Sequence, residues 1–151
     1  RMLADLGAEV LILHTAPKSK YKGDAAYMLK GYKKVVLPEA DIIIDALLGT
    51  GFSGELRPFA HAIVDAINEA KNSFIFSVDV PSGLNGLTGL PQPVAVQAQL
   101  TVTFEEAKIG LALPQADAYT GTLVVTHIGI PNEVKYKRPA THQLIRENAL
   151  E

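Results

Sequence analysis

The sequence predicts an α/β fold of the Rossmann-like kind: a mostly parallel sheet with helices on both faces, in three αβα layers. Two observations support this prediction. Short apolar segments alternate with segments of helical periodicity along most of the chain, and this alternation is typical of βαβ units. Several of the apolar segments are apolar throughout, as expected for parallel strands that are buried on both faces.

The predicted strands are short and rich in aliphatic or β-branched residues. In chain order they span residues 10–13, 34–37, 42–46, 74–78, 99–104 and 121–131. Helical periodicity predicts helices over residues 18–32 and 58–70. The chain opens on "RMLADLG", which is typical of the last turns of a helix that stops at Gly7.

Composition limits the classes of protein that need to be considered. The 151 residues suit one domain, and 48% hydrophobic residues suffice for a core. The net charge of −2 gives no basic surface for nucleic acid or membrane, and no apolar run approaches the roughly 18–20 residues that span a bilayer. The chain has no cysteine, which excludes disulfides and thiolate chemistry and is compatible with a cytoplasmic protein.

A carboxylate and a glycine-rich loop follow the apolar strand at residues 42–46. Asp45 comes near its end, and "GTGFSGELRP" leads from there into the next predicted helix. Glycines let a backbone approach a ligand closely, and the free N–H groups at a helix start attract anions. The loop therefore suggests a site for a phosphate-bearing ligand. A tight turn that Asp45 caps is the structural alternative, and the turn alone does not decide between them.

A second carboxylate follows the strand at residues 74–78, where Asp79 opens "DVPSGLNGLTG". Parallel sheets bind ligands at the carboxyl ends of their strands, so we expect Asp45 and Asp79 to face one crevice. Like charges there need a cation, a shared proton or ligand donors. Asp45, Ser82 and backbone carbonyls would make an all-oxygen cation site. A long loop organised by an Asx-turn is the alternative.

Other polar residues point less clearly to a function. Lys108, in "TFEEAKIGL", could meet a phosphate or pair with an acid, and a surface ion pair is equally compatible. Ser82 is a poor candidate for a hydrolase nucleophile, because "DVPSG" lacks the G-x-S-x-G elbow. The histidines suit structural or solvated positions; they are His14, His61, His127 and His142.

Four motifs in order, "GTGFSGELRP" after Asp45, "SVDVPSGLNGLTG", "TVTFEEAKIGL" and "YTGTLVVTHIGIP", give the chain a specific resemblance. From about Arg1 to Pro131 it resembles the YjeF N-terminal domain family, the NAD(P)H-hydrate epimerases. The resemblance implies a Rossmann-like fold and a cofactor-repair reaction. In that reaction the R and S epimers of hydrated NADH or NADPH (NAD(P)HX) interconvert, so that an S-specific dehydratase can restore the cofactor.

The resemblance also implies roles for particular residues. Asp45 and Ser82 correspond to ligands of a potassium ion, and Asp79 to a substrate ligand. We add the hypothesis that Asp79 is the acid–base group. The phosphate-bearing part of the substrate would lie on a loop made of Gly49, Thr50, Gly51, Phe52, Ser53, Gly54 and Glu55. The family's tendency suggests a homodimer.

The chain departs from the family pattern in two places. The family's Asn-Asn-Gly-Gly-Asp-Gly loop lies upstream of "RMLADLG", so we expect the site to be incomplete as the chain stands. Gln99 stands where the family usually has Asp. We expect residues 1–131 to form the epimerase-like domain. Residues 132–151 resemble a linker toward a kinase-like dehydratase domain. We therefore expect the chain to be an internal fragment of a bifunctional repair enzyme.

The sequence allows two other functions. A non-catalytic scaffold of the same fold would bind a nucleotide or a partner without turnover, but a scaffold has no need to retain Asp45, Asp79 and Ser82. A generic dehydrogenase is disfavoured, because no G-x-G-x-x-G follows the first predicted strand.

Overall fold

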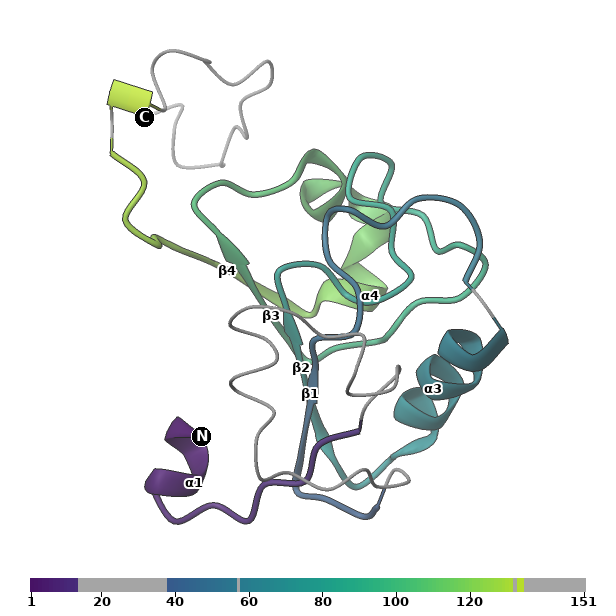
Figure 1. The fold of residues 1–151 in the computed structure, drawn as a ribbon. Helices are drawn as coiled ribbons and strands as arrows, with labels where there is room; N and C mark the ends of the chain where they lie inside the picture. Colours follow the sequence, from purple (N-terminus) through teal and green to yellow (C-terminus); the bar gives the residue numbers. More distant parts are fainter. Residues whose placement is uncertain (14–37, 57, 132, 135–151) are drawn as a thin grey trace. The chain divides into compact units, whose positions relative to one another are not determined.

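The computed structural model describes residues 1–13, 38–56, 58–131 and 133–134 (Figure 1). The chain forms two compact units, Arg1–Ala40 and Asp41–Glu151. The helix expected at residues 18–32 and the strand expected at 34–37 lie outside the described residues.

The described part of the first unit begins with helix α1 (Met2–Asp5). It stops where the sequence predicted, because Gly7 adopts a left-handed φ of 92° and its N–H donates to the Ala4 carbonyl at 3.0 Å. The strand expected at residues 10–13 is not formed. Only Ile12 makes a single bridge there, and a strand requires a run of paired backbone groups.

The second unit contains a four-stranded sheet in which all neighbours are parallel and the spatial order follows the sequence (Figure 1). Its strands are β1 (Ile42–Asp45), β2 (Phe74–Val78), β3 (Leu100–Phe104) and β4 (Thr122–Thr126). Helix α3 (Pro58–Glu69) connects β1 to β2. The connection from β3 to β4 contains η2 (Ile109–Ala112), η3 (Pro114–Ala116) and α4 (Asp117–Thr120). The predicted α/β, Rossmann-like parallel sheet is confirmed.

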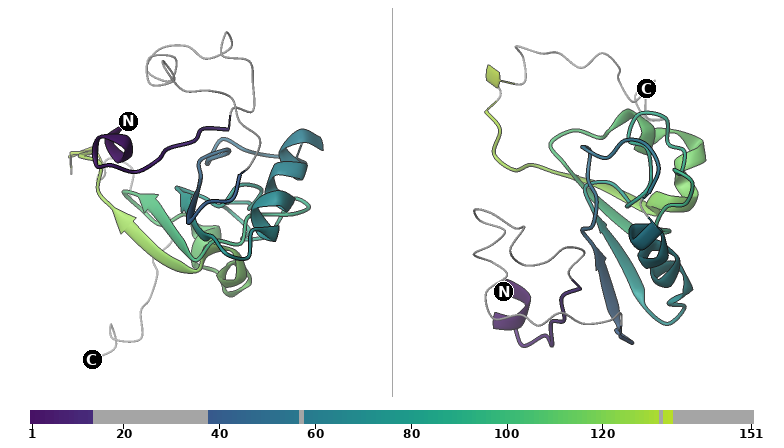
Figure 2. Two further views of the ribbon diagram at one scale, coloured as in Figure 1. Left: turned by 90° about the horizontal axis from the view of Figure 1, so that it is seen from below. Right: turned by 45° about the vertical axis from the view of Figure 1, so that its right-hand side comes forward.

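One face of this sheet carries the core. Figure 2 shows α3 and α4 on the same face. Buried apolar side chains, including one each from η2 and η3, form a cluster of Val80, Leu84, Ala95, Leu111 and Ala116. On the other face, the described structure leaves Ile42 59% exposed and Ile44 46% exposed. A helical layer on that second face stays a prediction.

The buried face changes character along the strands. Near the amino ends it is apolar, with Ile43 paired in register with Ile75. Two residues further along, the buried pair is Asp45 and Ser77, and Thr103 is buried on β3. Buried polar groups need hydrogen-bond partners. The carboxyl ends of the strands are therefore the place where a polar network has to form.

Glu105 explains why β4 ends earlier than the predicted residue 131. Its backbone adopts a left-handed φ of 61°, and its buried carboxylate accepts the N–H groups of Ile128 and Ile130. These are backbone donors that a longer strand would give to a neighbouring strand. Beyond Thr126, the Glu105 side chain therefore accepts these backbone N–H groups in place of a neighbouring strand.

Gln99 has a structural role at the amino end of the sheet. Its Oε1 accepts the N–H of Ile75 at 2.6 Å, and its backbone carbonyl accepts the N–H of Thr122 at 3.0 Å. The residue that departs from the family pattern therefore links β2, β3 and β4. It lies at the opposite end of the strands from Asp45 and Asp79.

Candidate functional site

The carboxyl end of β1 is held by a buried hydrogen-bond network around Asp45, which is 2% exposed. Its Oδ1 accepts the Ser82 hydroxyl at 2.6 Å and the Leu47 N–H at 3.3 Å. Its Oδ2 accepts the Ser82 N–H at 2.8 Å and the Ser77 hydroxyl at 2.9 Å. The network ties the loop after β2 to the end of β1, and it brings together Asp45 and Ser82 as the sequence suggested.

The oxygen atoms around Asp45 belong to a carboxylate, hydroxyls and a backbone carbonyl. None of the three ion pairs found among the described residues includes Asp45, so no cationic side chain there offsets its charge. The Ser82 hydroxyl oxygen accepts the Leu48 N–H at 2.9 Å and lies 3.5 Å from the Leu48 carbonyl oxygen. A carboxylate, a hydroxyl and a carbonyl are ligands for hard cations. They supply too few ligands for a complete shell, and the described residues hold no cluster of three or more metal-binding side chains.

Asp79 follows β2 and turns its side chain toward β3. Its φ of 70° is left-handed, a conformation uncommon for residues other than glycine. Its N–H still pairs with the Val102 carbonyl at 2.7 Å. The carboxylate is 18% exposed, and its Oδ1 accepts the Thr103 hydroxyl at 3.2 Å. The backbone thus leaves the regular strand conformation where this carboxylate is placed.

Lys108 forms an ion pair with Asp79, with 2.6 Å between Nζ and Oδ1. Its Nζ also lies 2.9 Å from the Thr103 hydroxyl oxygen and 3.2 Å from the Phe104 carbonyl oxygen. An ammonium group has three N–H donors, and each finds an acceptor here. Of the two partners that the sequence left open for Lys108, a phosphate or an acid, the structure shows the acid.

The ion pair with Lys108 lowers the pKa of Asp79. Burial by itself would raise the pKa of this carboxyl. Hydrogen bonding to Lys108, the Lys108 charge, and hydrogen bonds from Thr103 and the Phe104 backbone outweigh it, and they hold the pKa below its ordinary value of 3.8. Asp79 is therefore an ionised carboxylate at neutral pH, which can accept a proton but has none to donate.

The glycine-rich loop lies beside Asp79. A Cβ atom added to Gly49 would lie 3.7 Å from Asp79 Oδ2. The Gly49 carbonyl accepts the Phe52 N–H at 3.0 Å, which forms a tight turn, and Gly54 adopts a left-handed φ of 88°. Apart from Phe52, the residues from Gly49 to Glu55 are exposed. The strand ends thus bring an exposed backbone loop next to an ionised carboxylate.

The two predicted carboxylates end neighbouring parallel strands, as expected, but each has its own partners. Asp45 is held by serine hydroxyls and backbone N–H groups, whereas Asp79 is held by Lys108 and Thr103. Sequence reasoning did not single out Ser77 and Thr103. The available signal was polar residues at buried positions of these strands, one in "FIFSV" and two in "LTVTF".

The described histidines lie in other pairs. His61 contacts Asp65 at 3.0 Å within α3, and His127 Nδ1 lies 3.1 Å from Glu105 Oε2. The Ser82 hydroxyl, which donates to Asp45, is fully buried. Among the described residues, Ser82 thus has neither a histidine base nor the exposure that a hydrolase nucleophile needs.

Fold and site together define a Rossmann-like α/β protein with a polar site at the carboxyl ends of its parallel strands. The family described as "YjeF-related protein N-terminus" matches residues 1–110. The chain belongs to this family, and the matched residues include Asp45, the loop at 49–55, Asp79, Ser82 and Lys108. The family resemblance found in the sequence is confirmed.

The chain is similar in sequence to several named proteins over most of its length. It is 36% identical over 148 residues to the "NAD(P)H-hydrate epimerase" of Rhodopirellula baltica, covering 89% of this chain and 60% of the relative. It is 37% identical over 141 residues to the "Bifunctional NAD(P)H-hydrate repair enzyme Nnr" of Coxiella burnetii, covering 86% and 28%. The Methanothermobacter thermautotrophicus protein of the same name is 47% identical over 93 residues, covering 62% and 18%.

The chain therefore spans less than two thirds of the length of each of these relatives. In the part of the chain that the structure describes, no helix is both long and apolar enough to cross a membrane.

Proposed function

We propose that the chain is an NAD(P)H-hydrate epimerase domain, which interconverts the R and S forms of hydrated NADH and NADPH. The observation that carries the proposal is that the family match covers every residue of the site, while the fold brings Asp79 against the glycine-rich loop. The names of the relatives support the same reaction.

The site suggests how the substrate would bind. The residues from Gly49 to Glu55 are exposed apart from Phe52, whose N–H already bonds to the Gly49 carbonyl, so the other N–H groups of the loop could meet the phosphate-bearing part of the dinucleotide. Asp79 Oδ2 faces Gly49 and would meet the hydrated nicotinamide ring. Because Asp79 is ionised, as an acid–base group it would first accept a proton as the hydrate opens, and it would return that proton as the hydrate recloses on the other face.

We also propose a potassium ion as cofactor, held by Asp45 and Ser82 with the Leu48 carbonyl. A buried carboxylate with no cationic neighbour among the described residues supports a monovalent cation there. When bound, the ion would supply the positive charge that offsets Asp45. Other ligands would complete its shell.

The proposed location and partners rest on the composition and the family resemblance, and the proposed fusion rests on the names of the relatives. We propose a cytoplasmic homodimer that acts on a small molecule, with no nucleic-acid or membrane partner, in keeping with a net charge of −2 and the lack of cysteine. Two of the relatives above are named bifunctional. We propose the same arrangement here, with residues 1–131 as the epimerase domain and residues 132–151 as the linker to a fused dehydratase domain.

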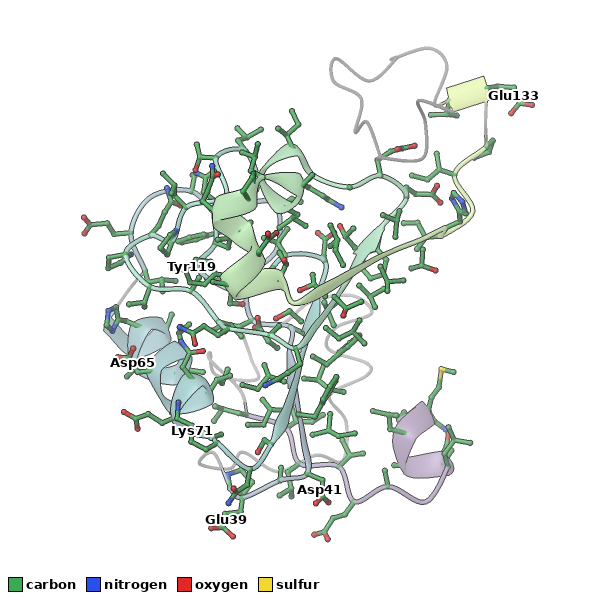
Figure 3. All side chains as sticks on the ribbon, turned by 180° about the vertical axis from the view of Figure 1, so that it is seen from behind. Glu39, Asp41, Asp65, Lys71, Tyr119 and Glu133 are labelled. Atoms are coloured by element: carbon green, nitrogen blue, oxygen red, sulfur yellow. The ribbon has the colours of Figure 1, made fainter. Side chains whose placement is uncertain are left out.

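The test is a coupled assay on the full-length protein that carries this sequence. NADPH-hydrate of mixed R and S form is supplied with an S-specific dehydratase, and NADPH recovery is followed. We expect recovery to go to completion, and the variant Asp79→Ala to leave it stalled at the S fraction. Asp65→Ala, which removes a half-exposed carboxylate on α3 that contacts His61 (Figure 3), serves as the control away from the site.

Two outcomes would count against the proposal. If recovery stalls with the unmodified protein, the chain is not an epimerase, and NADPH binding without turnover would then favour the scaffold. If Asp79→Ala epimerises at the unmodified rate, Asp79 has no role in the chemistry.

A further inference from the structure

We propose that Lys108 is the positioning residue for Asp79: its ammonium group fixes one carboxylate oxygen, and the other is left directed toward the substrate loop. This inference rests on the proposed epimerase function and goes beyond it, since it assigns a role to a lysine that the sequence left open between a phosphate ligand and a surface ion pair.

The two oxygens of Asp79 have different surroundings. Lys108 Nζ and the Thr103 hydroxyl both reach Oδ1, at 2.6 Å and 3.2 Å. Oδ2 faces the turn after β1, where an added Cβ at Gly49 would lie 3.7 Å away. The carboxylate is therefore held from the β3 side and presented to the loop on the β1 side.

Lys108 is itself held in place, which distinguishes it from a mobile surface lysine. Its Nζ has acceptors at Thr103 and Phe104 in addition to Asp79, and its side chain is only 22% exposed. The first part of its stem passes over Gly86, where an added Cβ would lie 3.8 Å from Lys108 Cβ. With its three donors engaged, the ammonium group has none left for a phosphate.

The ion pair also helps to stabilise the backbone conformation of Asp79. A left-handed φ of 70° is unfavourable for an aspartate, and such conformations persist where surrounding contacts stabilise them. The ion pair and the Thr103 hydrogen bond are contacts of this kind. Without the ammonium group, the carboxylate would lose both its fixed direction and the nearby positive charge that lowers its pKa.

The variant Lys108→Met tests the proposal, because it removes the charge and keeps an unbranched stem. In the coupled NADPH-hydrate assay we expect kcat to fall at least about tenfold while KM changes little, as for a group that acts on the reacting step. Activity that needs ionised Asp79 is lost as the pH falls through its pKa. Since the variant raises that pKa, the acid limb should move to higher pH.

Three further variants complete the series. Lys108→Arg should recover part of kcat. Lys71→Met, which removes a lysine just after α3 (Figure 3) whose ammonium group donates an exposed hydrogen bond to the Asn68 carbonyl, should match the unmodified protein. If Lys108→Met fails to fold, Thr103→Val removes the hydroxyl that touches both partners and should shift the acid limb in the same direction. The proposal would be overturned if Lys108→Met kept both the kcat and the acid limb of the pH–activity profile of the unmodified protein. It would also be overturned if Thr103→Val left that acid limb unchanged.

A measurement without turnover separates this proposal from the proposed function. The Asp79 carboxyl carbon is titrated by carbon-13 NMR in the full-length protein without substrate. We expect its midpoint to rise in Lys108→Met and to stay unchanged in Lys71→Met. If the unmodified protein does not epimerise, the proposed function fails, yet the titration still decides: an unchanged Asp79 midpoint in Lys108→Met would refute the pairing on which the positioning role depends.

Discussion

Asp45 and Asp79 show two ways of stabilising a carboxylate at the end of a strand. Asp45 is fully enclosed and relies on four neutral donors from Leu47, Ser77 and Ser82. Asp79 is partly exposed and relies on the ammonium group of Lys108. The first arrangement joins two segments of chain firmly, whereas the second keeps a charged oxygen near the surface. Asp45 thus suits a structural or cation-binding role, and Asp79 suits a substrate-binding role.

Replacing Asp45 by asparagine should destabilise the fold. An amide can accept at only one of its two polar atoms, so donors that now reach the other carboxylate oxygen would be buried without an acceptor. Each such loss costs about 1–3 kcal/mol, and we expect the free energy of unfolding in urea to fall by at least about 2 kcal/mol. Asp41→Asn, at the exposed residue before β1 (Figure 3), should change it by less than about 0.5 kcal/mol. Equal values for the two variants would contradict the network described here.

At the scale of elements, glycines let the segments after the strands pack closely. Gly110 lies in η2, and its N–H donates to the Gly86 carbonyl at 2.8 Å. A Cβ on Gly110 would lie 2.6 Å from the Asn85 carbonyl oxygen and 2.7 Å from the Gly89 nitrogen. Because Gly86 also lies against the stem of Lys108, the position of η2 bears on the site itself.

Gly110→Ala should therefore separate η2 from the loop after β2. The atoms in the way belong to the backbone, so relief requires a shift of main chain, and overpacking of this kind costs about 1–3 kcal/mol. We expect a lower thermal midpoint together with weaker epimerisation. Gly51→Ala is the matched control for stability, because an added Cβ there meets nothing within 4 Å. If Gly110→Ala and Gly51→Ala had equal thermal midpoints, η2 would be able to shift without loss of stability, and the prediction would be wrong.

At the scale of the whole molecule, the proposed cation site makes stability depend on the salt present. A ligand that binds only the folded state raises the free energy of unfolding with its concentration. We expect potassium chloride to raise the thermal midpoint of the full-length protein more than sodium chloride at equal ionic strength. Ser82→Ala, which removes a proposed ligand, should abolish the difference. Identical shifts for the two salts in the unmodified protein would count against a potassium site at Asp45 and Ser82.

The sequence by itself determined the fold class and the places where polar chemistry gathers. Alternating apolar and helical segments indicated the parallel sheet, and Asp45 and Asp79 could be placed at strand ends. The helix stop at Gly7 was equally visible. These features follow from local periodicity and from backbone preferences, which a short stretch of sequence carries within itself.

Only the tertiary structure decided the partners. Asp79 and Lys108 are 29 residues apart in sequence, and they meet because β2 and β3 are neighbours in the sheet. Glu105 ends β4 at Thr126, and Gln99 joins three strands at their amino ends. The physical reason is that a polar side chain buried at a strand end takes whichever donor or acceptor the packing brings within reach, and strand order, not sequence spacing, sets that choice.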